Sequence, residues 1–362
     1  MDTALSDIHS FDHYVDLVST SQAIWGTSVK LFVRERIADT VLRAGRQTTA
    51  NGKTVLFVHG ATFPSVPDFD LPYQDYSWMA YLAAVGFDVY AVDLAGYGKS
   101  SRIHMDDPRN VRAEHKPLIG QHEGPAAFPY PTVSTLAEWN EVDAAVEFVR
   151  RQTGAARVNL IGWSRGGLRV GGYAALHPEK VARVVMLAPL YGRNSPDAPP
   201  SDFKFGAPTA VATRGTTMGR WDKGIGFEDQ YDPAIRDVIW ESNMAFDAVG
   251  ATWGPGVIRH PAYYVAGWNA KLARHFKAPV LMIVGDFDVE VPPETVRNLY
   301  DDISSDSKLL LHVSGSHYFV YERQYKLLHA ASKDWLLSGK YNGATRGIMR
   351  VDRAGNISSV SQ

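Results

Sequence analysis

Six short runs of the chain are rich in valine, isoleucine and leucine, and each run is continuous rather than alternating. Continuous apolar runs of this length are typical of strands that are buried on both faces of a parallel sheet. An earlier segment, LFVRERI, mixes apolar and charged residues and predicts an antiparallel strand at the edge of that sheet, over residues 31–37. The parallel strands are expected at residues 55–58, 89–92, 158–161, 184–187, 280–284 and 309–313.

Helical patterns separate these runs. In residues 136–151, for example, apolar side chains recur at spacings of three or four, which places them on one side of a helix. Strands that alternate with helices predict an α/β fold, with a doubly wound, mostly parallel sheet and helices on both faces. The other helices are expected at residues 77–85, 165–177, 294–300 and 323–337.

Two stretches interrupt the alternation. Residues 101–134 are polar, contain proline and histidine, and predict a long surface excursion. Residues 190–268 are far longer than the usual connection of about 2–6 residues plus a helix, so we interpret them as an inserted, mainly helical cap over the carboxyl edge of the sheet. The core is then expected at residues 30–189 and 269–338, with an N-terminal extension at 1–29 and a loosely held, polar C-terminal tail at 339–362.

Composition narrows the classes of function. The chain has 362 residues, a formal net charge of -2 and no cysteine, which excludes disulfides, thiolate nucleophiles and cysteine-bound metals. It carries no basic stripe of a nucleic-acid binder, no signal-peptide pattern at its start and no apolar run long enough to span a bilayer. We expect a cytoplasmic protein with a small-molecule substrate, no nucleic-acid partner and no membrane span; a homo-oligomer stays open.

One pentapeptide carries the strongest chemical signal. Gly162-Trp163-Ser164-Arg165-Gly166 fits the pattern G-x-S-x-G and lies between an expected strand and an expected helix. That setting is the one in which this pattern holds a nucleophilic serine on a strained turn, with glycines where larger side chains would collide. The alternative is a glycine-rich packing turn with an inert serine, and the strand–turn–helix context favours the nucleophile.

A serine hydroxyl needs a base, and the base in turn needs a group that orients it. His317 follows the expected strand at 309–313, and two carboxylates, Asp286 and Asp288, follow the strand at 280–284. The chain therefore presents serine, aspartate and histidine in that order, each just after a buried strand.

Together these motifs resemble the α/β-hydrolase fold superfamily, over about residues 30 to 338. The matching segments are VHGAT after the first parallel strand, DLAGYGKS after the second, GWSRG, and the two loops GDFD and GSH. The resemblance implies that Ser164 is the nucleophile, His317 the base and Asp288 the acid. Asp286 is the second choice, as a turn residue, and Glu290 the third; His59 is expected to support the neighbouring loop.

By the same resemblance, the backbone N–H groups of Ala61 and Arg165 form the oxyanion hole. The loop reads HGAT rather than the HGGG of many lipases, so a lipase subgroup is not supported. Thr62 either adds its hydroxyl to the hole or only holds the turn. Serine at the elbow also excludes the haloalkane dehalogenases and epoxide hydrolases of this fold, which use aspartate there.

Aromatic residues suggest the character of the pocket. A wall of tryptophan, tyrosine and phenylalanine suits an apolar or aromatic substrate of modest size. Arg165 and Arg169 have two interpretations, contact with a substrate carboxylate or a solvated ion pair. The pocket residues that we expect are Thr62, Phe63, Trp163, Tyr191, Trp221 and Trp253.

The resemblance implies an esterase-like serine hydrolase that cleaves a carboxylic ester, or a lactone, through an acyl-enzyme and needs no metal or organic cofactor. Carbon–carbon bond hydrolysis, amide hydrolysis and acyl transfer use the same triad and stay open as alternatives. A second class of function is a small-molecule receptor on the same scaffold, with turnover weak or lost.

Overall fold

The computed structural model describes residues 7–120, 124–200 and 206–360. In this part of the chain a ten-stranded sheet lies at the centre, with the strand order β1-β2-β4-β3-β5-β6-β9-β10-β11-β12. The block from β4 to β11 is parallel, whereas β1, β2 and β12 pair antiparallel with their neighbours. The central strands are β3 (Thr54–Val58), β4 (Asp88–Asp93), β5 (Val158–Trp163), β6 (Val181–Leu187), β9 (Val280–Gly285) and β10 (Lys308–Val313).

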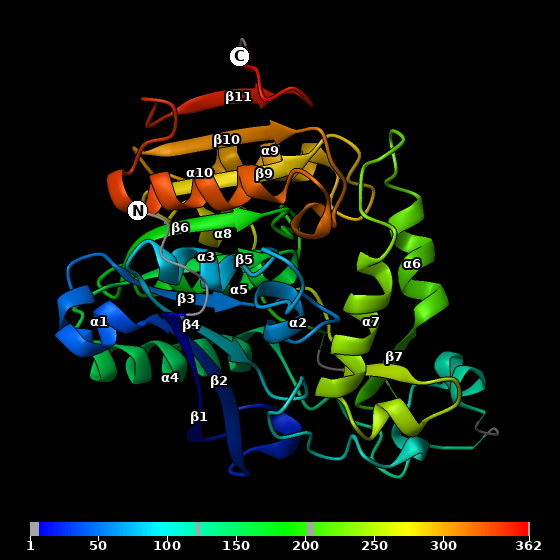
Figure 1. Cartoon of the computed structure of the whole chain (residues 1–362). Helices are drawn as coiled ribbons and strands as arrows, with labels where there is room; N and C mark the ends of the chain where they lie inside the picture. The colour runs from blue at the N-terminus through cyan, green and yellow to red at the C-terminus, as the bar shows by residue number, and fades with distance from the viewer. Residues whose placement is uncertain (1–6, 121–123, 201–205, 361–362) are drawn as a thin grey trace.

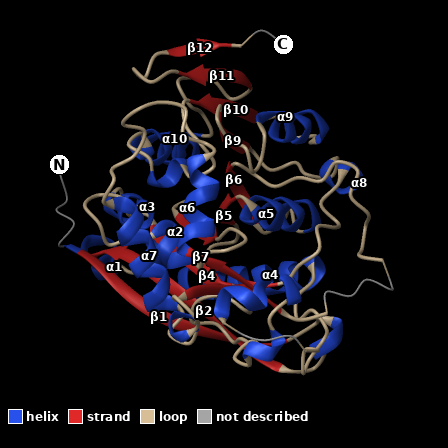
Figure 2. Cartoon of the chain, turned by 90° about the vertical axis from the view of Figure 1, so that its right-hand side faces the viewer, coloured by secondary structure: helices blue, strands red, loops and turns tan. Residues whose placement is uncertain are grey.

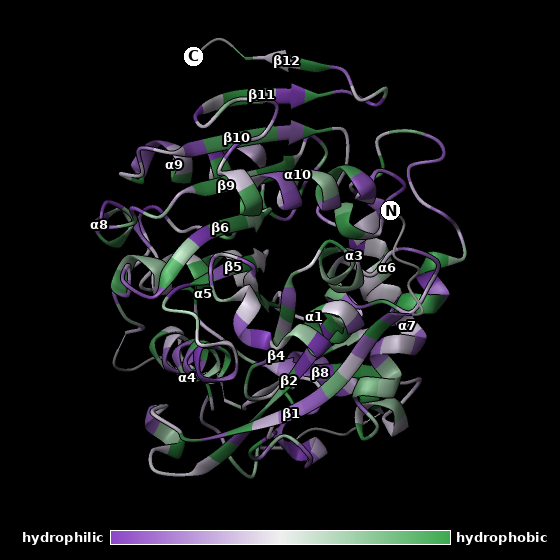
Figure 3. Ribbon diagram, turned by 60° about the vertical axis from the view of Figure 1, so that its left-hand side comes forward, coloured by the Kyte–Doolittle hydropathy of each residue, from purple (hydrophilic) through white to green (hydrophobic). Residues whose placement is uncertain are grey.

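These six strands are the six continuous apolar runs of the sequence, each longer by one to three residues. Every residue of β3, β4, β5 and β9 is buried, which explains why their sequences are mainly apolar rather than alternating. Figure 3 shows hydrophobic residues concentrated in the central strands, while β1 (Ile8–Val18) carries much hydrophilic colour.

Helices cover both faces of the sheet. The helices α3 (Trp78–Ala84) and α10 (Tyr325–Ser338) lie on one face, and α4 (Thr135–Thr153), α5 (Arg165–Leu176) and α9 (Pro293–Asp302) lie on the other (Figure 2). All five expected helices are present, and the doubly wound α/β fold is confirmed. Shorter helices are α1 (Asp39–Ala44), α2 (Ser65–Phe69) and α8 (Ala270–Ala273). No helix among the described residues is both long and apolar enough to cross a bilayer.

The two ends of the sheet differ from the expectation. The segment at 31–37 is an antiparallel strand, β2 (Ser28–Ala38), but it is not the edge, because β1 pairs with it from Ile8↔Ala38 to Val18↔Ser28. Residues 8–18 were missed as a strand because only Ile8 and Val15 of β1 are fully buried. Residues 1–6 lie outside the described part.

The C-terminal tail is not loosely held over its length. The strand β11 (Gly347–Val351) pairs in parallel with β10, and β12 (Ile357–Ser359) pairs with β11. Backbone pairing covers the open edge of β10 and buries Ile348 and Val351. The tail is therefore held by backbone hydrogen bonds, which its polar sequence does not reveal. Residues 361 and 362 lie outside the described part.

The segment between β6 and β9, in which the cap was expected, contains its own small sheet and two helices. These are β7 (Thr209–Thr213), α6 (Arg214–Asp222), α7 (Ile235–Phe246) and β8 (Val257–Pro261), with β7 and β8 antiparallel. In Figure 1 the arrowheads of β6 and β10 point toward the side on which α6 and α7 stand. The segment therefore lies at the carboxyl edge of the sheet.

Part of the excursion at residues 101–134 packs against this segment. Val111 forms a parallel bridge with Thr209 at the start of β7, and the Arg112 N–H donates to the Thr209 carbonyl at 2.9 Å. Two short 3-10 helices, η4 (Pro108–Asn110) and η5 (Ala113–Ile119), lie in the excursion. Residues 121–123 of the excursion and 201–205 of the expected cap lie outside the described part.

Candidate active site

Ser164 occupies the tip of a sharp turn between β5 and α5. Its φ of 56° and ψ of -119° are strained for a residue with a side chain. The Ser164 N–H donates to the Leu187 carbonyl, and the Ser164 carbonyl accepts from the N–H groups of Gly167 and Leu190, each at 2.9 Å. A nucleophile elbow requires a strained serine whose backbone is fixed in this way by three hydrogen bonds. An ordinary packing turn does not need such strain.

The two glycines of the motif are explained by contact with backbone. A Cβ on Gly162 would lie 2.4 Å from the Gly166 carbonyl oxygen, and a Cβ on Gly166 would lie 2.1 Å from that of Val58. Both distances are below any real contact, and backbone cannot move aside as a flexible side chain can.

We expect Gly166→Ala to lower the free energy of unfolding by at least about 2 kcal/mol, because the methyl group forces β3 and α5 apart. Gly219→Ala is the matched control, since a Cβ there meets nothing within 4 Å in α6. That change should be neutral or stabilise by about 0.5–1 kcal/mol. Urea unfolding of both variants checks this, and equal stabilities would show that the turn can open without cost.

His317 and Asp288 form a buried pair just after β10 and β9. The His317 Nδ1 lies 2.8 Å from Asp288 Oδ2, and the other carboxylate oxygen accepts the N–H groups of Glu290 and Val291 at 2.9 and 2.7 Å. These two hydrogen bonds fix the position of the carboxylate independently of the ring. With Nδ1–H donating to Asp288, the ring's Nε2 is left as the free acceptor, the atom that a base uses.

The two other candidate acids have different partners. Asp286 pairs with Arg350 and lies 3.4 Å from His312 Nδ1, so its side chain turns toward β10 and β11. Glu290 accepts the Tyr318 hydroxyl at 2.7 Å. Neither carboxylate bonds to His317, so the geometry favours Asp288.

The environment of His317 sets its protonation. Burial alone lowers the pKa of the His317 ring, but the charge of Asp288 and the hydrogen bond to it outweigh burial and raise the pKa above the ordinary value of 6.5. The Asp288 carboxylate therefore stabilises the imidazolium that forms when the ring accepts a proton.

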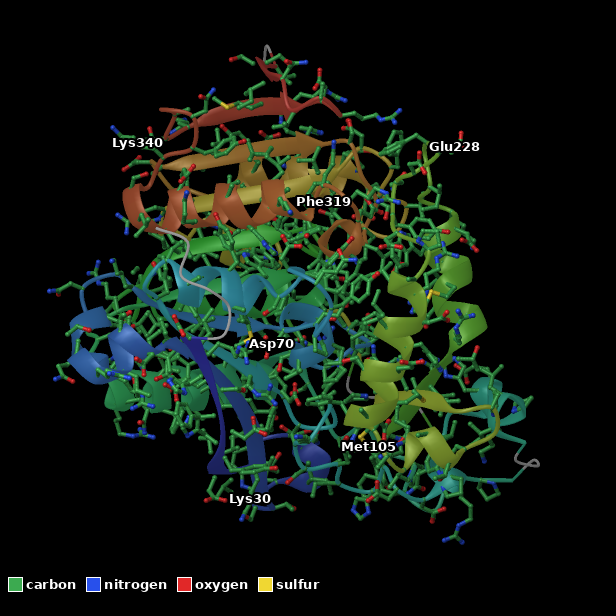
Figure 4. The ribbon with its side chains drawn as sticks, viewed as in Figure 1. Lys30, Asp70, Met105, Glu228, Phe319 and Lys340 are labelled. Carbon is green, nitrogen blue, oxygen red and sulfur yellow. The ribbon has the colours of Figure 1, made fainter. Side chains whose placement is uncertain are left out.

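Ser164 and His317 line one cavity of about 140 Å³, which also opens onto the loop after β3. Phe319, which is labelled in Figure 4, belongs to the turn η7 (Phe319–Tyr321) just after His317. The other lining residues are Gly60, Ala61, Thr62, Phe63, Trp163, Leu190, Arg220, Tyr263, Glu290, Val291 and Tyr318.

Two backbone N–H groups are available beside Ser164. Ala61 lines the cavity, and its N–H has no acceptor among the described residues. Arg165 is the first residue of α5, and an N–H at that position has no partner within its helix and lies at the positive end of the helix dipole. These are the two donors that the sequence suggested for an oxyanion.

His59 has a supporting place. The Leu94 N–H donates to His59 Nε2 at 3.1 Å, so Nδ1 carries the proton and donates to the Gly60 carbonyl at 2.8 Å. Burial, with the nearby Arg169 charge, holds the pKa of His59 well below its ordinary value, so the ring is neutral.

Half of the expected pocket residues line the cavity, namely Thr62, Phe63 and Trp163. Tyr191, Trp221 and Trp253 do not. The Tyr191 hydroxyl donates to Asp302 at 2.7 Å, Trp221 stacks on Tyr318 behind the wall, and Trp253 packs with Arg259 in a separate cluster. Aromatic content predicts that rings pack, but not which ring faces the cavity.

The sequence missed Arg220, Tyr263 and Tyr318 as lining residues. Tyr318 directly follows His317, and this adjacency was the one available signal. Arg220 and Tyr263 come from the segment between β6 and β9, whose position over the site only the fold reveals.

Of the two interpretations of Arg165 and Arg169, the ion pair is confirmed, but the pair is buried and not solvated. The two guanidinium groups are fully buried and outside the cavity lining, and both bind Glu138 of α4, at 2.6 and 2.7 Å. They are therefore not solvated, and neither side chain lines the cavity.

Comparisons with known proteins agree with this geometry. A family model described as the alpha/beta hydrolase fold matches residues 53–324. A poly(3-hydroxyalkanoate) polymerase subunit from Haloferax mediterranei is 24% identical over 306 residues, which cover 74% of this chain and 56% of that protein. This chain thus spans little more than half the length of that relative.

Solved structures share the fold at low sequence identity. A membrane phospholipase A has a TM-score of 0.52 at 16% identity, over 92% of this chain and 88% of that chain. A serine hydrolase involved in carbazole degradation has a TM-score of 0.51 at 17% identity, over 91% of this chain and 100% of its own. The thioesterase domain of the curacin biosynthetic pathway has a TM-score of 0.51 at 14% identity, over 91% and 100%.

Proposed function

This chain belongs to the α/β-hydrolase family, and on that premise we propose that it is a serine hydrolase that cleaves a carboxylic ester through an acyl-enzyme. The family match and the shared fold support hydrolase activity. The observation that carries the finer proposal is that Ser164, on its strained turn, and His317, fixed by Asp288, line the same small cavity.

Each group then has one role. Ser164 attacks the acyl carbonyl while His317 Nε2 takes its proton and returns that proton to the departing alcohol. Asp288 holds the ring and stabilises the imidazolium. The N–H groups of Ala61 and Arg165 bind the oxygen on which negative charge develops. Water then releases the acid from Ser164, with His317 again as the base.

The cavity supports a short acyl group. Its volume of about 140 Å³ is below the roughly 300–1,000 Å³ of sites for drug-sized ligands. Its wall combines apolar and aromatic side chains with polar ones, and the charges of Arg220 and Glu290, which lie 3.7 Å apart, balance each other. The proposed substrate is therefore an ester of a small, uncharged acid.

Nitrophenyl esters of increasing acyl length test this substrate class. We expect kcat/KM to be highest for two to four carbons and to fall about tenfold or more by eight carbons, because the longer chain has no room. Leu190→Ala enlarges the cavity and should move the optimum to longer chains, whereas Leu176→Ala, at the exposed end of α5, should leave the profile unchanged.

A preference for long or highly charged acyl groups would contradict the proposed substrate. A fluorophosphonate probe is expected to label the wild-type chain, and absence of labelling would contradict the serine hydrolase itself. One stoichiometric burst without further turnover would favour a receptor on this scaffold.

A further inference from the structure

Three successive carbonyl groups of the loop after β3 are held by a single buried network. The Arg169 Nη1 donates to the carbonyl oxygens of His59 and Gly60, at 2.7 and 2.9 Å. The Arg169 Nη2 lies 3.3 Å from the Tyr97 hydroxyl, and that hydroxyl donates to the Ala61 carbonyl at 2.9 Å. One guanidinium thus fixes, directly or through Tyr97, the whole stretch that carries the Ala61 N–H.

The Gly60 carbonyl and the Ala61 N–H belong to the same peptide group. In a planar trans peptide these two groups point in opposite directions. Arg169 and the His59 ring both donate to the carbonyl, so they hold it on the buried side of the loop. The Ala61 N–H is then aimed at the opposite side, where Ala61 lines the cavity beside Ser164.

The peptide group before it is fixed at both ends. The His59 carbonyl is held by Arg169, and the Gly60 N–H donates to Asp68 Oδ2 at 3.1 Å. The loop therefore cannot rotate the Gly60–Ala61 peptide without breaking several buried hydrogen bonds, each of which leaves an unpaired polar group.

The buried charged groups beneath this loop carry a net positive charge. Burial alone would raise the pKa of Glu138, but the charges of Arg165 and Arg169 outweigh burial and lower it, so the carboxylate stays ionised. Two guanidinium groups face this one carboxylate, which leaves one positive charge in excess. Burial raises the pKa of the neighbouring Glu141 to about 8, so that at neutral pH Glu141 does not cancel the excess charge.

We propose that Arg169 is a positioning residue of the oxyanion hole: it sets the orientation of the Gly60–Ala61 peptide and polarises it, so that the Ala61 N–H meets the developing oxyanion. A donor that is already oriented needs no reorganisation when charge develops, and a positive charge on its carbonyl makes it a stronger donor. The catalytic part of this inference rests on the proposed hydrolase function; the orientation of the peptide does not.

The test compares Arg169→Met and Arg169→Lys with Arg259→Met. Arg259 is the matched control, because it is also a buried arginine in an ion pair. It is 2% exposed and pairs with Asp247 at 2.6 Å, and it has no contact with the oxyanion loop. Arg169→Met should lower kcat by roughly 10²-fold with little change in KM, and should weaken a boronic acid inhibitor in parallel. Arg169→Lys should recover part of this loss, and Arg259→Met should lower stability but keep kcat.

Amide hydrogen exchange supplies a measurement that needs no turnover. Peptides that contain Ala61 should exchange faster in Arg169→Met than in the wild type, and at the wild-type rate in Arg259→Met. Unchanged exchange in both Arg169 variants, or a loss confined to KM, overturns the inference. If Ser164 is never labelled, the hydrolase proposal fails, whereas the exchange still decides whether Arg169 holds this peptide.

Discussion

Ser164→Ala is expected to lower kcat for nitrophenyl esters by roughly 10⁴- to 10⁶-fold and to abolish labelling by a fluorophosphonate. In the proposed mechanism the Ser164 hydroxyl is the only group of the protein that forms a bond with the acyl carbon. His317 and the oxyanion donors remain in place but have no nucleophile to activate, so that only the slow attack of water is left.

The same change should leave the fold intact. Alanine keeps the Cβ of serine, so the strain at a φ of 56° is unchanged, and the free energy of unfolding should move by less than about 1 kcal/mol. Because Ser164 and His317 act as one unit, the double variant with His317→Ala should be about as inactive as either single one. Labelling that survives in Ser164→Ala would place the nucleophile elsewhere.

The central fold could be predicted from the sequence because its strands are buried on both faces. In β9 every side chain is apolar, and in β5 Asn159 is the single polar one, so a mainly apolar run with a glycine at or next to its end marks the strand and the turn together. The strand β1 has no such signal, since it is exposed along most of one face, and β11 and β12 are held chiefly by backbone pairing.

The chemical groups could be predicted because each lies just past a strand end. Ser164, Asp288 and His317 lie just beyond β5, β9 and β10, whose parallel order brings their carboxyl ends to one edge of the sheet. A loop that leaves a buried parallel strand starts from a fixed position in space, so that residues far apart along the chain share a site.

The pocket wall and the support of the oxyanion loop could not be predicted in the same way. Trp221 lies behind the wall and Arg220, its neighbour in α6, lies on it, a difference set by the rotation of one helix. Arg165 and Arg169 look like surface residues in a sequence. Their spacing of four places them on one side of α5, but only the packing of α4 shows that this side meets Glu138.

Asp288→Asn is expected to lower kcat by roughly 10⁴-fold, whereas Asp286→Asn should retain nearly full activity. In the wild type the hydrogen bond of 2.8 Å between Asp288 and His317 Nδ1 sets the tautomer that leaves Nε2 free to accept the serine proton. We expect the loss of activity because the asparagine side chain no longer enforces this tautomer. An asparagine at position 288 presents no charge to stabilise the imidazolium. Asp286 is the matched control, being an aspartate of the same loop that pairs with Arg350 instead.

The pH profile distinguishes loss of this interaction from a general loss of structure. The base must be neutral, and the pKa of His317 is raised above 6.5 by Asp288, so kcat/KM should fall as pH drops through that raised value. In Asp288→Asn the raising charge is gone while burial remains. The pKa of His317 then falls, and the acid limb of the residual activity should move to lower pH. A limb that stays in place in Asp288→Asn but moves in Asp286→Asn would assign the acid to Asp286.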